Sequence, residues 1–92
     1  MGAVKLSPAQ EEALKMMKEK GGGVLVRWPG GFWTFSGAQG RAVYNRHGYL
    51  EYLVPEWWCG VRTVRALAKK GIVDMKLDAR GYEIAAVLKN EI

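Results

Sequence analysis

Glycine-containing turns are the feature that most constrains the fold of this 92-residue chain. Glycine and proline initiate turns and end regular structure, so the strands between such sites have to be short. Three of the turns, "PGG", "NRHG" and "DARG", are flanked by segments rich in β-branched and aromatic residues. This pattern predicts three β-hairpins. Their arms are residues 24–28 with 32–36, 41–44 with 49–54, and 72–77 with 82–88.

Two other segments have the apolar spacing of amphipathic helices. Residues 8–20 follow Ser7, whose hydroxyl is a good N-cap, and they end at a run of three glycines. Residues 60–71 form the second segment, which ends at Gly71. Two helices and three hairpins in so short a chain predict one α+β domain over residues 1–92.

Positive charge is concentrated in the second helix. The chain has 14 Lys and Arg against 9 Asp and Glu, for a net charge of +5. Residues 61–71 contain four basic residues and no acidic one, so this segment alone contributes +4. A localised excess of this kind indicates an anionic partner more strongly than a high isoelectric point does.

Several classes of protein are excluded or disfavoured by the residue content. A single cysteine, Cys59, cannot form an intrachain disulfide, and no apolar run reaches the ~20 residues that span a bilayer. We therefore expect a cytoplasmic protein with no membrane contact. The one histidine, His47, and Cys59 cannot make a four-ligand zinc site, so no metal or other cofactor is expected. The start of the basic helix is expected to lower the pKa of Cys59, but no catalytic set accompanies it, and we expect no enzyme.

The basic helix has the composition of a nucleic-acid-binding element. Arg62, Arg65 and Lys69 stand at positions i, i+3 and i+7, which places them on one helical face. Lys70 follows, and Thr63 lies in the first turn, where a hydroxyl can contact a phosphate. A helix with one packed side and one cationic side fits the major groove of double-stranded DNA.

The segment "TVRALAKKGIVDM" resembles the recognition helix of winged helix-turn-helix proteins running into their wing. The resemblance covers residues 6–20 and 60–88 and implies that residues 72–88 form the wing, with Lys76 and Arg80 contacting the DNA backbone. The expected fold is therefore a winged-helix-like domain with an aromatic β-hairpin or sheet inserted between the first helix and the basic helix. The stretch "RWPGGFW", with "TVRAL" and "KKG" downstream, also resembles small phage and prophage proteins. The two resemblances together imply a regulator of phage or prophage origin. Four phosphate contacts predict a salt slope of only about −3.6, so tight binding would require more contacts or a homodimer.

A second hypothesis is an interaction protein, a phage-encoded inhibitor of a host protein complex such as an anti-CRISPR protein. The cationic face would then bind an acidic protein or a guide RNA. Tryptophans are frequent anchors of protein interfaces, and they also stack on unpaired bases. The candidates for such contacts are Trp28, Trp33, Trp57 and Trp58. Filling the core is the competing explanation for these side chains.

Overall fold

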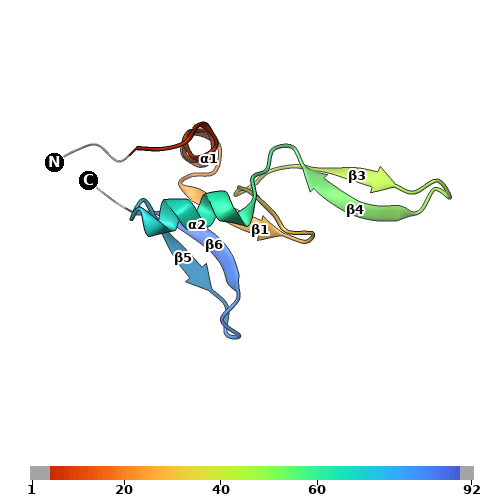
Figure 1. The fold of residues 1–92 in the computed structure, drawn as a ribbon. Coiled ribbons are helices and arrows are strands. Elements are labelled where there is room, and N and C mark those ends of the chain that lie inside the picture. The colour runs from red at the N-terminus through yellow and green to blue at the C-terminus, as the bar shows by residue number, and fades with distance from the viewer. Residues whose placement is uncertain (1–4, 90–92) are drawn as a thin grey trace.

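The computed structural model describes residues 5–89, so the ends of the predicted domain, 1–4 and 90–92, lie outside the described residues. It is an α+β fold with two helices and six strands in the described part (Figure 1). The elements in chain order are α1 (Pro8–Glu19), β1 (Val24–Trp28), β2 (Phe32–Phe35), β3 (Gly40–Tyr44), β4 (Leu50–Pro55), α2 (Val61–Lys69), β5 (Val73–Leu77) and β6 (Glu83–Leu88). The α+β class, both helices and all three hairpins are confirmed.

Helix α1 begins with a reciprocal cap. The Ser7 hydroxyl accepts a hydrogen bond from the Gln10 backbone N–H at 3.2 Å, and the Gln10 side chain accepts one from the Ser7 N–H, also at 3.2 Å. The helix is followed by a buried glycine, Gly21, where a Cβ would lie 2.6 Å from the Val24 carbonyl oxygen. Only glycine therefore lets the chain turn this closely from α1 into β1.

Helix α2 is short and is held at both ends. Its N-cap, Gly60, has no side chain with which to cap the first turn. Just before it, Cys59 exchanges two backbone hydrogen bonds with Trp33 of β2, at 2.8 and 3.0 Å. At the other end Gly71 adopts a φ of 79°, and the Ile72 N–H donates to the Leu67 carbonyl at 3.0 Å. The chain then enters β5 directly.

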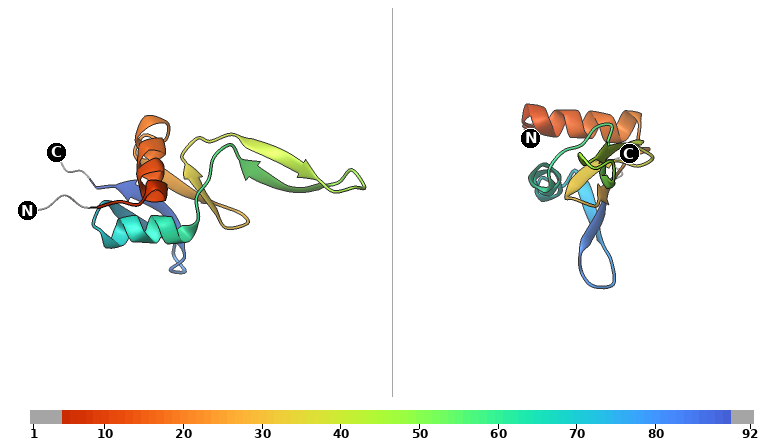
Figure 2. Two further views of the ribbon diagram at one scale, coloured as in Figure 1. Left: turned by 45° about the horizontal axis from the view of Figure 1, so that its top comes forward. Right: turned by 90° about the vertical axis from the view of Figure 1, so that its right-hand side faces the viewer.

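Four strands form one antiparallel sheet in the order β2-β1-β6-β5. Leu25 on β1 lies opposite Phe35 on β2 and Ala86 on β6, so these three side chains share one face of the sheet. Both helices pack on that face (Figure 2). The buried apolar core consists of Ala13, Met17, Leu25, Trp33, Phe35, Val64, Leu67, Val73 and Ala86.

Strands β3 and β4 form a separate two-stranded sheet that projects from the body as an arm (Figures 1 and 2). This arm accounts for the elongated shape of the molecule, which measures 57 × 30 × 21 Å. At its base the Glu56 N–H donates to the Gln39 carbonyl at 2.8 Å. The Trp28 ring lies over Gly40, where a Cβ would approach it to 2.9 Å. The absence of a side chain at Gly40 thus lets the arm rest against the body.

The segment between the two helices contains strands and no helix within the described residues. The expected aromatic insertion is accordingly two hairpins, of which β1–β2 joins the main sheet and β3–β4 does not. Neither helix in the range 5–89 has the length and apolar character needed to cross a bilayer.

Candidate nucleic-acid interface

Two of the predicted cations on α2 are exposed. Arg62 and Lys69 lie seven residues apart, so they occupy nearly the same side of the helix, opposite the buried Val64 and Leu67. Neither makes an ion pair with any of residues 5–89. These two side chains are the part of the predicted cationic face that stays available to an anion.

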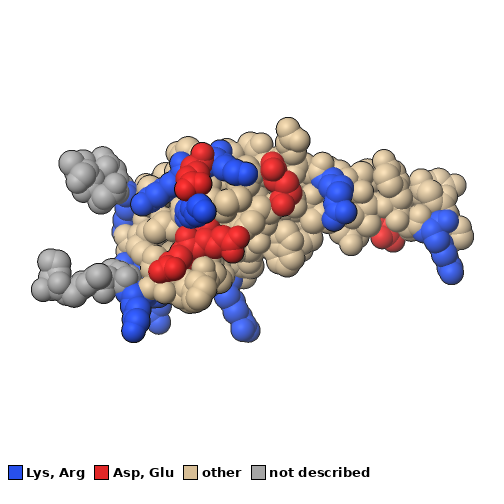
Figure 3. Space-filling model, turned by 90° about the horizontal axis from the view of Figure 1, so that it is seen from above, with Lys and Arg blue, Asp and Glu red and all other residues tan. Residues whose placement is uncertain are grey.

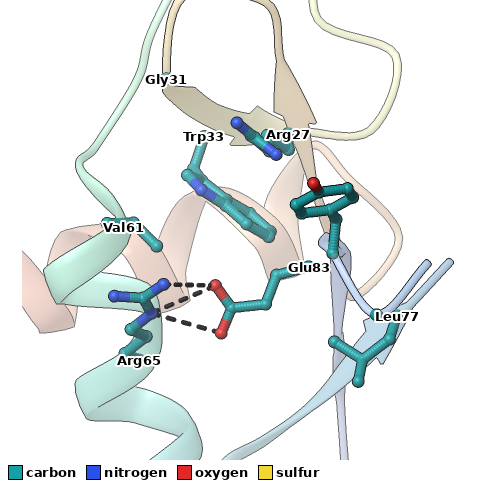
Figure 4. A pocket seen from close by; sticks show the side chains of 9 residues that line it. Arg27, Gly31, Trp33, Val61, Arg65, Leu77 and Glu83 are labelled. Atoms are coloured by element: carbon teal, nitrogen blue, oxygen red, sulfur yellow. Dashed lines mark hydrogen bonds and ion pairs between the residues drawn. The ribbon is translucent and has the colours of Figure 1, made fainter.

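Arg65, the third cation predicted for this helical face, forms an ion pair with Glu83. Its Nη2 lies 2.8 Å from Oε1 of Glu83 on β6, and its Nε lies 3.1 and 3.2 Å from the two carboxylate oxygens. Figure 4 shows the two side chains pointing toward one another. The hydrogen bond to Arg65 lowers the pKa of Glu83, and the same pairing raises the pKa of Arg65. The Arg65 side chain is nevertheless 60% exposed, so one side of the guanidinium still faces solvent.

Lys70 is directed elsewhere than predicted. Its Nζ donates to the Lys5 carbonyl oxygen at 2.7 Å and to Oε1 of Gln10 at 2.6 Å. Lys70 therefore ties the end of α2 to the start of α1 and does not extend the stripe formed by Arg62 and Lys69. Its role in the structure is to join the two helices, because both of its acceptors belong to the α1 region.

The β5–β6 hairpin brings one further unpaired cation. Arg80 is exposed in the turn, where the Asp78 carboxylate accepts hydrogen bonds from the Arg80 and Tyr82 backbone N–H groups at 2.8 and 3.0 Å. Those bonds shape the turn and leave the Arg80 guanidinium without an ion pair among the described residues. Lys76, by contrast, pairs with Asp74 at 3.1 Å, which locally cancels its charge.

A cleft of about 580 Å³ lies between α2, the β1–β2 turn and the β5–β6 hairpin (Figure 4). Arg27 and Arg65 contribute two positive charges to its lining, and Glu83 contributes one negative charge. The proximity of Arg27 also helps to lower the pKa of Glu83. The complete lining is Arg27, Gly31, Trp33, Val61, Arg65, Leu77, Gly81, Tyr82 and Glu83. The cleft thus has a net positive charge and two aromatic residues, Trp33 and Tyr82, in its lining.

Thr63 lies in the first turn of α2 and is half-buried. Its backbone N–H donates to the Gly60 carbonyl at 3.1 Å. That amide is consequently occupied within the turn, and only the hydroxyl of Thr63 remains for the predicted phosphate contact.

The four tryptophans differ in their exposure. Trp33 is 1% exposed and fills the core beneath α2, which is the competing explanation given for these side chains. Trp57 stacks on Phe35, and its Nε1–H donates a hydrogen bond to the Glu12 carboxylate at 3.1 Å, so this side chain stabilises the fold. Trp28 is half-buried against the arm. Trp58, 51% exposed, is the tryptophan that remains accessible to a partner.

The expectation that the helix start lowers the pKa of Cys59 is wrong. Burial, with a smaller contribution from the nearby Glu12 carboxylate, raises the pKa of this thiol to about 11. The thiol is therefore protonated near neutral pH and is a poor nucleophile. His47 is exposed in the turn of the β3–β4 arm. Within residues 5–89 no three His, Cys, Asp or Glu side chains gather in a way that could hold a metal ion.

The sequence reasoning missed the exposed apolar residues of the β3–β4 arm. Tyr44, Tyr49, Leu50, Tyr52 and Leu53 are 48–72% exposed. The signal for them was present, because "YLEYLV" places large apolar side chains on both faces of a strand. Such a strand is either covered on both faces within the protein or available to a partner.

No protein-family model, curated protein or solved structure matches this chain.

Proposed function

We propose that the protein binds double-stranded DNA in the manner of a winged-helix domain, with α2 in the major groove and the β5–β6 hairpin as the wing. The order of elements supports this proposal. Helix α2 leads through Gly71 directly into the β5–β6 hairpin, as the recognition helix leads into the wing in the family that the sequence resembles. The helix that normally precedes the recognition helix is replaced by strands, so the resemblance concerns the two DNA-contacting elements.

The observation that carries the proposal is the pair of exposed cations, Arg62 and Lys69, on the outer face of α2, which form no ion pair with any described residue. Arg62 and Lys69 are exposed, and the opposite side of the helix is fixed in the core by Val64 and Leu67. A helix anchored in this way presents its cations at a constant spacing to phosphates or base edges. Arg80 adds a cation at the tip of the adjacent hairpin.

The ion pairs of Arg65 and Lys76 reduce the predicted strength of binding. Each cation that neutralises a phosphate contributes about −0.9 to the slope of log K against log salt. Arg62, Lys69 and Arg80 acting alone would give a slope of about −2.7. Binding by one copy of the chain is therefore expected to be weak and strongly favoured by low salt.

The test is a fluorescence-anisotropy titration of a labelled duplex with the double variant Arg62→Ala/Lys69→Ala. At about 50 mM salt, loss of two phosphate contacts lowers the association constant by on the order of a hundredfold. The matched control is Lys15→Ala/Lys18→Ala on α1, which removes the same charge from two exposed lysines outside α2. Both variants should retain the wild-type circular dichroism spectrum and thermal melt.

The control determines how the result is interpreted. If the two double variants weaken binding equally, only the net charge matters, and α2 is not the contact element. An unlabelled single strand and an RNA duplex of the same sequence serve as competitors. Stronger competition by either of them would contradict a preference for double-stranded DNA.

A further inference from the structure

Strand β1 has a charged side chain at a position where its alternation predicts an apolar one. Arg27 lies two residues after the buried Leu25, so both side chains are on the sheet face that the helices cover. Its neighbour across the strand pair is the buried Trp33. Arg27 is nevertheless exposed and makes no ion pair with any of residues 5–89. The packing of the sheet does not require a guanidinium here, and such a group is well suited to binding an anion.

A β-bulge shapes the opposite wall of the cleft. The register of β5 against β6 shifts between Lys76 and Leu77, which leaves Leu77 opposite Glu83. The shift turns Glu83 to the sheet face on which α2 packs, where its carboxylate reaches Arg65 (Figure 4). Tyr82 is 58% exposed and lines the same cleft. Bulges often redirect a side chain beside a functional site in this way.

The charges in the cleft favour a ligand with a single negative charge. Arg27 and Arg65 contribute +2 and Glu83 contributes −1, so the lining has a net charge of +1. The hydrogen bond from Arg65, with smaller contributions from the charges of both arginines, lowers the pKa of Glu83, so its carboxylate is ionised near neutral pH. A monoanion neutralises this lining, whereas a dianion would leave an excess negative charge beside Glu83. Arg27 is the cation available to that monoanion, because Arg65 already pairs with Glu83.

The size and the apolar lining of the cleft suit a small molecule. Its volume of about 580 Å³ lies within the usual range of small-molecule sites, about 300–1,000 Å³. Leu77 and Tyr82 line it and are 57% and 58% exposed, so both have apolar surface left to cover. Val61 adds a half-buried aliphatic side chain from α2. Aliphatic and aromatic walls of this kind pack well against a flat ring.

The cleft differs in charge from the face of the molecule that carries α1. Seen from above, acidic and basic side chains are interspersed over the body (Figure 3). The hollow along α1, of about 350 Å³, is lined by two Lys and two Glu and has no net charge. The electrostatic attraction of a small anion is therefore stronger at the cleft than at this hollow.

We propose that the cleft binds a small aromatic carboxylate, with the carboxylate group on Arg27 and the ring against Leu77 and Tyr82. A guanidinium can bind a carboxylate through two parallel N–H···O hydrogen bonds. Glu83 stays paired with Arg65 and repels a second negative group. The cations assigned to DNA, Arg62, Lys69 and Arg80, are not in this lining, so the site goes beyond the proposed function and does not depend on it.

An NMR titration of the isotope-labelled full chain with phenylacetate tests the proposal. The backbone amide signals of Gly31, Val61 and Gly81, which come from the three walls of the cleft, should shift together. We expect a dissociation constant in the millimolar range or below, given the affinity per atom of small ligands. The signals of Gly22 and Gly48, which lie outside the lining, should not move.

Three related compounds separate the contributions of charge and ring. Phenethylamine has the same ring with a positive charge, acetate has the carboxylate without a ring, and inorganic phosphate supplies a stronger negative charge. Each should bind at least about tenfold more weakly than phenylacetate. Equal binding of phenethylamine would show that the cleft selects only an apolar body, and tighter binding of acetate or phosphate would show a simple anion site. Either result would overturn the proposal.

The variant Arg27→Gln should raise the dissociation constant of phenylacetate about tenfold or more, because it removes a charge-assisted hydrogen bond. Arg41→Gln is the matched control, since Arg41 is an exposed arginine on β3 outside the lining. Tyr82→Ala should raise the constant about three- to tenfold through loss of the ring contact. Thermal melts should show that all three variants fold.

Two further results would contradict the assignment. One is the absence of any shift in the cleft signals at about 20 mM phenylacetate, well above the expected dissociation constant. The other is an equal loss of binding in Arg41→Gln and Arg27→Gln, which would show that the carboxylate does not contact Arg27. These measurements contain no nucleic acid, so their outcome is distinct from that of the DNA titration.

Discussion

Replacing Glu83 by Gln tests whether the ion pair with Arg65 restrains DNA binding. The carboxylate contacts the guanidinium at 2.8, 3.1 and 3.2 Å, so it competes directly with any phosphate that approaches Arg65. The Glu83→Gln variant keeps the size of the side chain and removes its charge. Arg65, which points from the same helix as Arg62 and Lys69, would then be able to neutralise one additional phosphate.

The size of the effect follows from counterion release. One more neutralised phosphate steepens the slope of log K against log salt by about 0.9 and raises the association constant about eightfold at 0.1 M salt. This is an upper limit, because the Arg65 side chain is already 60% exposed and contributes part of its charge in the wild type. Anisotropy titrations at four or more salt concentrations give both the affinity and the slope.

Glu19→Gln provides the control for the Glu83 variant. Glu19 is exposed at the end of α1 and makes no ion pair among the described residues, and its replacement changes the net charge by the same amount. If Glu83→Gln binds DNA no more tightly than Glu19→Gln, then Arg65 does not reach the DNA. If, in addition, Arg62→Ala/Lys69→Ala binds DNA with the wild-type affinity, then the outer face of α2 is not the contact surface.

Three further predictions concern stability. Thr34 is fully buried, and its hydroxyl has no hydrogen-bond partner among residues 5–89. Thr34→Val should therefore raise the free energy of unfolding by about 1 kcal/mol and the melting temperature by about 4–8 °C, and a lower melting temperature would contradict this. Gly21→Ala places a Cβ 2.6 Å from a carbonyl oxygen and should lower the free energy of unfolding, measured in urea, by about 1–3 kcal/mol. In the control Gly60→Ala the added Cβ has no heavy atom within 4 Å, and the free energy of unfolding should change by less than about 1 kcal/mol. Cys59 has its pKa raised in the folded state from 9.0 to about 11, so its unfolded form ionises first as the pH rises. Between pH 9 and 11 the free energy of unfolding should fall by at most about 3 kcal/mol, and solvent screening of the partly exposed thiol makes this fall smaller. Cys59→Ser should abolish this component of the pH dependence.

Local signals in the sequence were sufficient for the secondary structure. The turns at 29–31, 45–48 and 78–81 each join two adjacent segments, so their hairpins depend only on nearby residues. The limits of α1 likewise follow from Ser7 and the glycines after residue 20. In each case the interactions that select the structure lie within a few residues of one another.

The pairing of distant segments could not be predicted in this way. Strand β6 lies between β1 and β5, and nothing in the local pattern indicates that β3 and β4 stay outside that sheet. The cations of α2 show the same limitation. Arg65 contacts a residue 18 positions away and Lys70 contacts one 60 positions away, so helical spacing alone indicates neither contact.

The pair of hydrogen bonds between Cys59 and Trp33 has a consequence for recognition. It fastens the chain to the edge of β2 one residue before the N-cap of α2, while the turn at Gly71 fastens the other end to β5. A nine-residue helix secured at both ends loses little conformational entropy when a ligand docks on it. Selectivity at this helix would thus come from the ligand adapting its shape to a rigid template, and a groove that is stiff or too narrow would be rejected.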